Sequence, residues 1–361
     1  MKILVISNMY PSENAPNYGT FVKNFCDQLE QLNMNFDKVV MIKESNKLAS
    51  YFKYYFRVIA NILSKKYDFI YVHYASYNAL PILFTYLFKK IKIYTNVHGG
   101  DVIPQTKMQF RLQKYTQRLL QVSDKIIAPS EYFKNEVSEM YRIPRSKIMI
   151  YPSAGVNERL FYPYPEEEKD KIEINDFKPD RSNEYIGYVG RIERGKGWET
   201  FLRAIYLLKK NRKIKGKRFI IIGYGNEYSK FNEMIKEYDL SDVVYKIKYL
   251  PQSELPKVYN ILSVFCFPTE AKESLGLVAL EALACGVPVI ASDYAAPKEY
   301  IIDGYNGFKF QKGNSEDLAN KIDAFFNLEN SQVKQLRENA HITGSKYYTK
   351  IIRNTLVEIL K

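Results

Sequence analysis

Short runs of aliphatic and aromatic residues alternate along the chain with longer segments in which apolar residues recur every three or four positions. The first series of short runs covers residues 2–7, 38–42, 69–73, 91–97, 125–128 and 147–151, and the second covers residues 185–189, 219–222, 243–247, 264–267 and 289–291. Strands separated by segments of helical length are typical of a parallel sheet with helices on both faces. The pattern therefore predicts an α/β protein with two doubly wound domains.

The stretch between the two series has a different composition. Residues 162–183 are rich in proline and charged residues, as in linkers and exposed excursions. We therefore expect a first domain over residues 1–165, a linker or excursion over 166–183, a second domain over 184–345 and a C-terminal helix over 346–361. A chain of 361 residues, 46% of them hydrophobic, is long enough to bury two cores.

One segment of the second domain combines helix signals with acidic residues. Residues 277–284 favour a helix that begins after Gly276 and ends before a Gly-Val-Pro sequence. Free N–H groups and the positive end of the helix dipole at Gly276 and Leu277 favour a phosphate. Glu281 lies about 7.5 Å further along such a helix, which matches the reach from a nucleotide phosphate to its ribose. Glu273, in the preceding loop, is then expected to face the group that the phosphate carries.

Glu273 and Glu281 belong to a longer pattern. Ser-Leu-Gly follows Glu273, and Gly-Val-Pro-Val-Ile-Ala-Ser stands beyond Glu281. This Glu-x7-Glu pattern resembles that of the retaining glycosyltransferases of family four, whose GT-B fold has two Rossmann-like domains facing across a cleft. The resemblance implies that Glu273 faces the donor sugar, that Glu281 holds the ribose of a nucleotide diphosphate sugar, and that a C-terminal helix crosses back to the first domain. As an isolated pair, two glutamates eight positions apart are more often simply solvated.

Positive charge follows the first strand of the second domain. Gly190 allows close backbone approach at the strand end, and Arg191 and Lys196 supply fixed charges of the kind that a diphosphate needs. Such loops lie at the edge of the sheet where α/β proteins bind ligands. Arg191 and Lys196 match the family's diphosphate-binding pair, whereas ordinary surface charge is the alternative for each. Gly223, after the next strand, either lines the nucleotide pocket or makes a tight turn.

The first domain offers a second set of candidates. Gly19 precedes a helix and matches one glycine of the family's glycine-rich loop, where backbone N–H groups approach the leaving phosphate. His98 and Asp101 follow a strand, as in the family's His-Gly-x-Asp motif. The resemblance implies that His98 contacts the donor sugar or its developing charge and that Asp101 orients His98 or the sugar hydroxyls. A structural histidine and a turn or helix-cap aspartate are the alternatives.

Together these residues predict a hexosyltransferase that works at the front face of the donor and retains the anomeric configuration. Arg191, Lys196 and the helix start at Gly276 are expected to neutralise the leaving diphosphate. The sequence has no Asp-x-Asp pair after a strand near this site, so we expect no metal and no cofactor besides the donor substrate, a nucleotide diphosphate sugar. The rival hypotheses are a sugar-nucleotide epimerase or hydrolase of the same fold and a non-catalytic nucleotide-binding protein.

The charge of the chain is unevenly distributed. The formal net charge is +13, and residues 48–125 contain 12 basic and 3 acidic residues. Aromatic residues are interleaved with them, and one helical face within residues 107–118 carries four basic residues: Lys107, Arg111, Lys114 and Arg118. We expect this face to meet an anionic membrane. A plain solvated face is the alternative, and no nucleic-acid-binding signature accompanies the charge.

Cysteine usage and the apolar runs bear on location. Three cysteines without metal-like spacing indicate free thiols in a reducing compartment. The N-terminal apolar run is too short for a signal peptide, and residues 80–88 are too few to span a bilayer. We therefore expect a cytoplasmic protein, peripheral on the inner membrane face, whose acceptor is a lipid-linked or cell-surface polysaccharide precursor.

Overall fold

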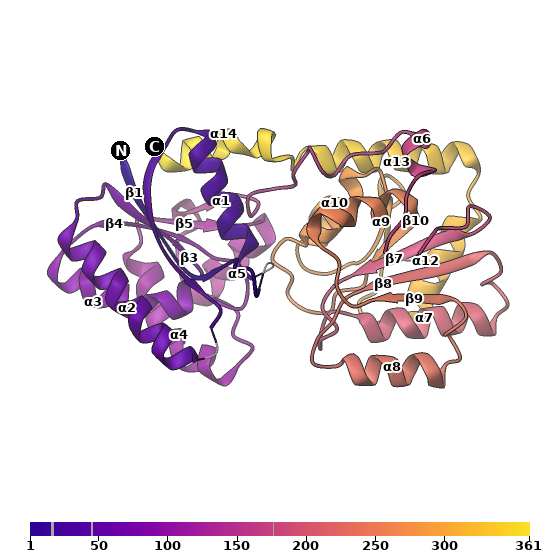
Figure 1. Cartoon of the computed structure of the whole chain (residues 1–361), viewed down its shortest axis with the longest axis horizontal. Helices are drawn as coiled ribbons and strands as arrows, with labels where there is room; N and C mark the ends of the chain where they lie inside the picture. The colour runs from indigo at the N-terminus through magenta and orange to yellow at the C-terminus, as the bar shows by residue number, and fades with distance from the viewer. Residues whose placement is uncertain (16–17, 45, 176) are drawn as a thin grey trace. The chain divides into compact units, whose positions relative to one another are not determined.

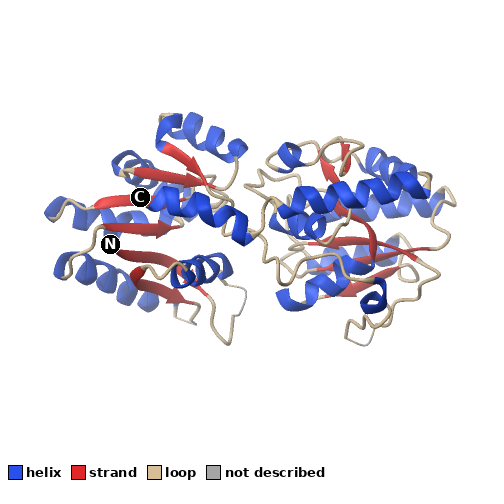
Figure 2. Cartoon of the chain, turned by 90° about the horizontal axis from the view of Figure 1, so that it is seen from above, coloured by secondary structure: helices blue, strands red, loops and turns tan. Residues whose placement is uncertain are grey.

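The structure, a computed structural model, describes residues 1–15, 18–44, 46–175 and 177–361 of the chain. It divides into two units, of which the first comprises Met1–Ala154 and Ile352–Lys361 and the second Gly155–Ile351. Each unit contains one six-stranded parallel sheet with helices on both faces (Figures 1 and 2). The predicted α/β fold of two doubly wound, Rossmann-like domains is therefore confirmed.

The first sheet has the strand order β2-β1-β3-β4-β5-β6. Its strands are β1 (Lys2–Tyr10), β2 (Asn35–Ile42), β3 (Phe69–His73), β4 (Lys92–Asn96), β5 (Lys125–Ala128) and β6 (Ile148–Ile150). Its helices are α1 (Thr20–Gln31), α2 (Lys47–Ser64), α3 (Ala75–Phe88), α4 (Lys107–Val122) and α5 (Glu131–Tyr141). The last helix of the chain, α14 (Thr349–Leu360), adds Ile352, Leu356 and Ile359 to the core around β1 and α1. Apolar side chains fill both faces of β1, as expected for a strand that helices cover on both sides.

The second sheet has the strand order β12-β11-β10-β7-β8-β9. Its strands are β7 (Glu184–Val189), β8 (Lys217–Ile222), β9 (Val244–Ile247), β10 (Leu262–Phe267), β11 (Val289–Ser292) and β12 (Gly307–Phe310). Its helices are α6 (Glu166–Lys169), α7 (Trp198–Lys210), α8 (Tyr228–Glu237), α9 (Leu255–Ile261), α10 (Leu277–Ala284), α11 (Pro297–Tyr300), α12 (Ser315–Phe326) and α13 (Asn330–Ser345). Short 3-10 turns lie at Arg145–Lys147 in the first unit and Gln252–Glu254 in the second.

Each sheet contains a point at which the strand order reverses. β1 lies between β2 and β3 in the first sheet, and β7 lies between β8 and β10 in the second. Parallel α/β sheets bind ligands in the crevice outside the carboxyl ends of the strands at such a point. The loops after β1 and β3, and those after β7 and β10, are therefore the places to look for function.

The division between the units differs from the predicted boundary at residue 165. Residues 155–165 belong to the second unit. Val156 forms a β-bridge with Tyr348, and both pack with Phe161 in the core of that unit. The Tyr348 hydroxyl also donates a hydrogen bond to the carbonyl oxygen of Phe161 at 3.0 Å. These partners lie nearly two hundred positions apart in the sequence, so local composition could not indicate them.

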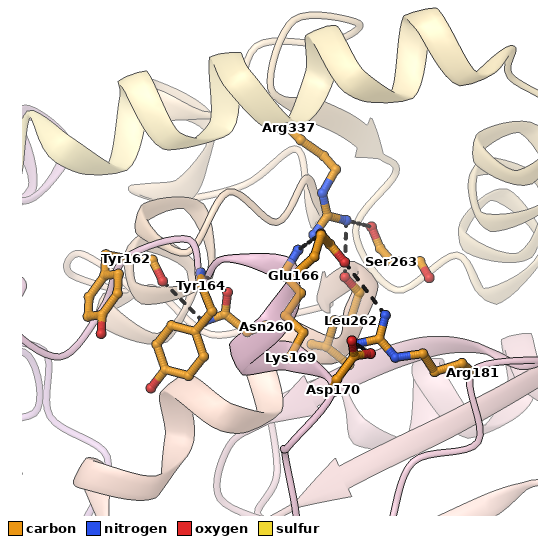
Figure 3. Close-up of polar contacts among 10 residues, drawn as sticks. All are labelled: Tyr162, Tyr164, Glu166, Lys169, Asp170, Arg181, Asn260, Leu262, Ser263 and Arg337. Atoms are coloured by element: carbon orange, nitrogen blue, oxygen red, sulfur yellow. Dashed lines mark hydrogen bonds and ion pairs between the residues drawn. The ribbon is translucent and has the colours of Figure 1, made fainter.

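The predicted linker over residues 166–183 is likewise part of the second unit (Figure 3). Arg181 forms ion pairs with Glu166, at 3.5 Å, and with Asp170, at 2.5 Å. Ile172 is buried in the same core as β7 and β10. The charged composition that suggested a linker therefore serves ion pairs on the surface of a folded unit.

Candidate functional site

Two loops of the second unit meet at the carboxyl ends of β7 and β10. The backbone N–H groups of Glu270 and Ala271 both donate hydrogen bonds to the carbonyl oxygen of Gly195, each at 2.9 Å. Gly197 lies so close to the second loop that an added Cβ would be 1.7 Å from the carbonyl oxygen of Pro268. These contacts fix the loop that follows β7 against the loop that follows β10.

The interlocked loops bring Lys196 and Glu273 together. The Lys196 Nζ lies 2.8 Å from the Glu273 Oε2, and the two side chains are only 24% and 19% exposed. Beneath them, the buried Tyr188 hydroxyl donates a hydrogen bond to the Lys196 carbonyl oxygen at 3.3 Å. The lysine expected at a diphosphate and the glutamate expected at a sugar thus form one ion pair.

The helix α10 begins at Leu277, directly after Gly276. Gly276 has a φ of 84°, and an added Cβ there would lie 2.8 Å from the Tyr300 hydroxyl, so only glycine suits the position. Within the described parts of the chain, the backbone N–H groups of Leu277 and Val278 donate no hydrogen bond. Unpaired N–H groups at the positive end of a helix are an anion-binding arrangement.

Glu281 lies on α10, where it is only 5% exposed. Its Oε1 accepts a hydrogen bond from Gln252 Nε2 at 2.9 Å, and its Oε2 accepts one from the Tyr259 hydroxyl at 3.2 Å. Burial raises the pKa of Glu281 from 4.5 to about 7, although both hydrogen bonds act in the opposite direction. Near pH 7 the Glu281 carboxyl therefore exists in both its protonated and its ionised form, and neighbouring side chains contact both of its oxygens. The sequence did not indicate Gln252 or Tyr259, since both come from other elements.

Arg191, Gly190 and Gly223 make contacts close to them in the sequence or at the neighbouring strand end. The exposed Arg191 guanidinium pairs with Glu193 at 2.6 Å, whereas Lys196 pairs with Glu273. Gly223 packs against Gly190, because an added Cβ at Gly223 would lie 1.8 Å from the Gly190 carbonyl oxygen. This close approach at the ends of β7 and β8 accounts for a glycine at Gly223.

In the first unit, His98 follows β4 and contacts His73 at the end of β3. The His98 Nε2 lies 3.1 Å from the His73 Nδ1, and the two rings stack with centroids 5.3 Å apart. Burial lowers the pKa of both imidazoles, that of His98 to about 3, so both rings are neutral at physiological pH. The sequence pattern did not single out His73. A second histidine at the end of a neighbouring strand was the available signal.

Asp101 is fully buried and binds backbone N–H groups. Its Oδ1 accepts hydrogen bonds from the N–H of His98 at 3.0 Å and of Gly99 at 2.8 Å, and its Oδ2 accepts one from the N–H of Ala75 at 2.9 Å. Ala75 is the first residue of α3, so Asp101 ties the His98 loop to that helix. These contacts fit the helix-cap alternative, and they give Asp101 a positioning role.

Gly19 precedes α1 in a left-handed conformation with a φ of 80°. An added Cβ would lie 2.6 Å from the Met9 backbone carbon, so a glycine is needed where α1 starts against the end of β1.

The predicted basic face is helical, because Lys107, Arg111, Lys114 and Arg118 all lie on α4. Each of the four side chains is exposed.

Three further observations concern the described residues as a set. They contain no group of three or more His, Cys, Asp and Glu side chains arranged to hold a metal ion. None of the helices they form has both the length and the apolar character to cross a bilayer. A cavity of about 600 Å³ is lined by Arg181, Arg337 and the first residues of β7 and β10. It therefore lies at the edge of the sheet opposite to the edge with Lys196 and Glu273.

Two family models match consecutive parts of this chain. The model described as "Glycosyltransferase Family 4" matches residues 25–154, and the model described as "Glycosyl transferases group 1" matches residues 169–343. The chain belongs to the family-four glycosyltransferases, which have the GT-B fold.

Relatives of this family-four chain include one archaeal and one bacterial protein. It is 29% identical over 254 residues to an uncharacterized glycosyltransferase of Methanocaldococcus jannaschii, covering 70% of this chain and 63% of that protein. It is also 29% identical over 223 residues to the capsular polysaccharide biosynthesis glycosyltransferase CapM of Staphylococcus aureus, covering 61% of this chain and 56% of CapM. The matched regions span less than two thirds of either relative.

Solved structures share the fold of this family-four chain. HepE of Anabaena, in complex with UDP and glucose, has a TM-score of 0.78 and 16% sequence identity, covering 100% of this chain and 99% of HepE. At this identity the likeness establishes the GT-B fold.

Proposed function

We propose that this protein transfers a sugar from a nucleotide diphosphate sugar to an acceptor hydroxyl with retention of the anomeric configuration. The observation that carries the proposal is the Lys196–Glu273 ion pair, which joins the loop after β7 to the loop after β10. It places a cation suited to a diphosphate beside a carboxylate suited to sugar hydroxyls. The complex of HepE with UDP and glucose supports a donor of this class.

The ion pair also supports an order of events when the donor binds. Lys196 is neutralised by Glu273 before the donor arrives. A diphosphate competes for Lys196 and for the unpaired N–H groups of Leu277 and Val278. Glu273 Oε2 is then released to accept a hydrogen bond from the donor sugar, while Glu281 accepts one from the ribose.

The proposed chemical step is a front-face substitution. The acceptor oxygen bonds to the anomeric carbon on the face from which the diphosphate departs, and the bond between that carbon and the diphosphate oxygen breaks. The acceptor proton passes to the departing oxygen. Fixed positive charge at Lys196 and the start of α10 stabilises the negative charge that develops there.

We further propose that this step needs no divalent metal ion. Lys196 and the free N–H groups of α10 supply positive character at the diphosphate. Arg191 adds to it once the diphosphate has displaced Glu193 from the guanidinium. Activity that persists in excess chelator supports this proposal, whereas loss in chelator and rescue by magnesium or manganese contradicts it.

We also propose that the acceptor is a lipid-linked polysaccharide precursor reached from the membrane surface. Three adjacent helices of the first unit, α2, α3 and α4, carry largely exposed apolar side chains: Leu48, Phe52, Phe56, Leu87, Phe88 and Phe110. The same helix α4 that carries the exposed Phe110 also carries the basic face. Basic and exposed apolar residues together favour an anionic bilayer surface. The role of CapM in capsular polysaccharide biosynthesis supports an acceptor of this class.

A panel of nucleotide sugars tests the donor proposal. Binding and turnover are measured with UDP-, GDP- and ADP-linked hexoses, and product anomers are identified by NMR. Transfer of at least one hexose with retained configuration is expected. Inverted product contradicts the retaining mechanism, and release of free sugar that no acceptor accelerates favours a hydrolase.

Vesicle sedimentation tests the membrane proposal. We expect binding to anionic vesicles at low salt, loss of binding at high salt, and loss in the double variant Arg111→Glu/Lys114→Glu. A matched control reverses two exposed lysines of the second unit, Lys210→Glu/Lys236→Glu, and is expected to bind normally. Equal failure to bind anionic and neutral vesicles contradicts the proposal and leaves a water-soluble acceptor.

A further inference from the structure

A cavity of about 410 Å³ lies in the first unit at the carboxyl ends of β1, β2 and β3. Four tyrosines contribute to its lining, and we call them the tyrosine pocket: Tyr18, Tyr51, Tyr74 and Tyr77. They come from the segment before α1, from α2, from the end of β3 and from α3. From the sequence, Tyr51 was grouped with the aromatic residues near the basic segment, and Tyr18, Tyr74 and Tyr77 were given no role.

The rings of the tyrosine pocket are held in place by one another and by amide groups. Tyr77 lies between Tyr51, with ring centroids 5.6 Å apart, and Tyr74, with centroids 6.2 Å apart. Asn8 Nδ2 donates a hydrogen bond to the Tyr51 hydroxyl at 3.1 Å, and Gln109 Nε2 donates one to the Tyr74 hydroxyl at 3.0 Å. The rings are only partly buried. The pocket is therefore a preformed aromatic surface that a ligand can reach.

The charges of the cavity are confined to its rim. Its charged lining residues are Lys43, Glu44 and Lys47, all of them exposed. The inner lining consists of tyrosine, amide, serine and apolar side chains. Flat aromatic faces bordered by hydroxyl and carboxylate groups suit a ring with apolar C–H faces and a hydroxyl edge. A phosphate group would find fixed cations only at the rim.

The tyrosine pocket borders the loop that carries His98. Tyr74 directly follows His73, and an added Cβ at Gly100 would lie 3.2 Å from the Tyr74 hydroxyl. Both the pocket and the loop lie where the order of the first sheet reverses, at the edge of an α/β sheet that binds ligands. A molecule in the pocket therefore lies beside the loop that carries His98.

We infer that the tyrosine pocket binds a pyranose residue of the acceptor, so that the acceptor hydroxyl belongs to a saccharide. This inference rests on the proposed function and specifies the class of its acceptor. The helix α2 fits this role, since Lys47, Ser50 and Tyr51 line the cavity while Leu48, Phe52 and Phe56 on the same helix are exposed. A sugar joined to a membrane lipid can thus reach the pocket along a helix whose other side meets the bilayer.

Saturation-transfer NMR on the full chain tests the inference. The probes are methyl α- and β-pyranosides of glucose, galactose, mannose and N-acetylglucosamine, with inorganic phosphate in a parallel displacement experiment. We expect at least one pyranoside to bind, and Tyr77→Ala to weaken its binding about tenfold or more. Tyr77→Phe keeps the ring and is expected to bind normally. Tyr206→Ala, which removes an exposed ring from α7, is the matched control.

The outcomes separate the inference from the proposed function. If the chain binds nucleoside diphosphates but no pyranoside, the inference about the tyrosine pocket is wrong and the proposed donor site is unaffected. Equal pyranoside binding by Tyr77→Ala and the unaltered chain also overturns it, and displacement by phosphate shows an anion site instead. If Tyr77→Ala fails to fold, Glu44→Gln replaces it, because this exposed carboxylate lines the same cavity. Unchanged pyranoside binding in a folded Glu44→Gln then overturns the inference.

Discussion

The substitution Glu281→Gln is expected to stabilise the second unit at high pH while it weakens donor binding. Burial raises the pKa of Glu281 from 4.5 to about 7. The unfolded chain therefore loses this proton at a lower pH than the folded chain does. The free energy of unfolding falls as the pH rises from 4.5 to about 7 and stays reduced above that range. Glutamine has no proton to lose, so the variant avoids this cost.

The magnitude follows from the pKa difference. Moving a pKa from 4.5 to about 7 corresponds to about 3 kcal/mol. Glutamine can keep the hydrogen bond from Gln252 but must reorient the contact with Tyr259, which offsets part of the gain. We expect a net stabilisation of about 1–3 kcal/mol at pH 8 and little difference at pH 4.5.

The single tryptophan of the chain provides the assay. Trp198 is buried in the second unit, so its fluorescence reports the unfolding of that unit in urea. Titrations at pH 4.5 and pH 8 compare the unaltered chain, Glu281→Gln and the control Glu237→Gln, which changes an exposed glutamate of α8. A difference between Glu281→Gln and the unaltered chain that is equal at both pH values refutes the reasoning, as does a loss of stability at pH 8.

Three other outcomes are expected. Gly197→Ala should lower the free energy of unfolding by about 3 kcal/mol or more in the same urea assay, because its Cβ would collide with the Pro268 carbonyl oxygen. Gly216→Ala is the control, since Gly216 has a similar positive φ but open space around it, and it should lower the free energy of unfolding by about 1 kcal/mol. Because His73 positions His98, His73→Phe should lower kcat about tenfold to a hundredfold with little change in the donor KM. His73→Asn should keep part of the kcat that His73→Phe loses, and equal kcat in the two variants would show that His73 does not position His98. Glu273→Gln should lower kcat and strengthen nucleoside diphosphate binding, because the diphosphate no longer competes with the glutamate for Lys196, and a variant with full activity would show that the glutamate assignment is mistaken.

The sequence predicted those parts of the molecule whose signals are local. The alternation of short apolar runs with helical segments predicts both sheets, and Gly276 predicts the start of α10 at Leu277. Glu273 and Lys196 were selected separately, each from its own strand end. Their contact depends on β7 and β10 being neighbours, and strand order is not encoded in any local pattern.

The parts that the sequence did not predict depend on partners from distant elements. The contact between His73 and His98 exists only because β3 pairs with β4, which the sequence does not show. The tyrosine pocket unites residues from four segments, and tyrosine is common in this chain, so no single tyrosine was distinctive. The contact of Arg191 with Glu193, two positions along the chain, was not predicted either, and the expected role of Arg191 at a diphosphate stays a prediction.

The most direct test of the donor site is a calorimetric titration of UDP, GDP and ADP in excess chelator. It compares the unaltered chain with Lys196→Ala and with Lys178→Ala, which removes an exposed lysine at the other edge of the same sheet. We predict that at least one nucleoside diphosphate binds without metal, that Lys196→Ala weakens it about tenfold to a hundredfold, and that Lys178→Ala has no effect. Equal affinity in Lys196→Ala and the unaltered chain, or binding that appears only when a divalent metal is added, would contradict the account.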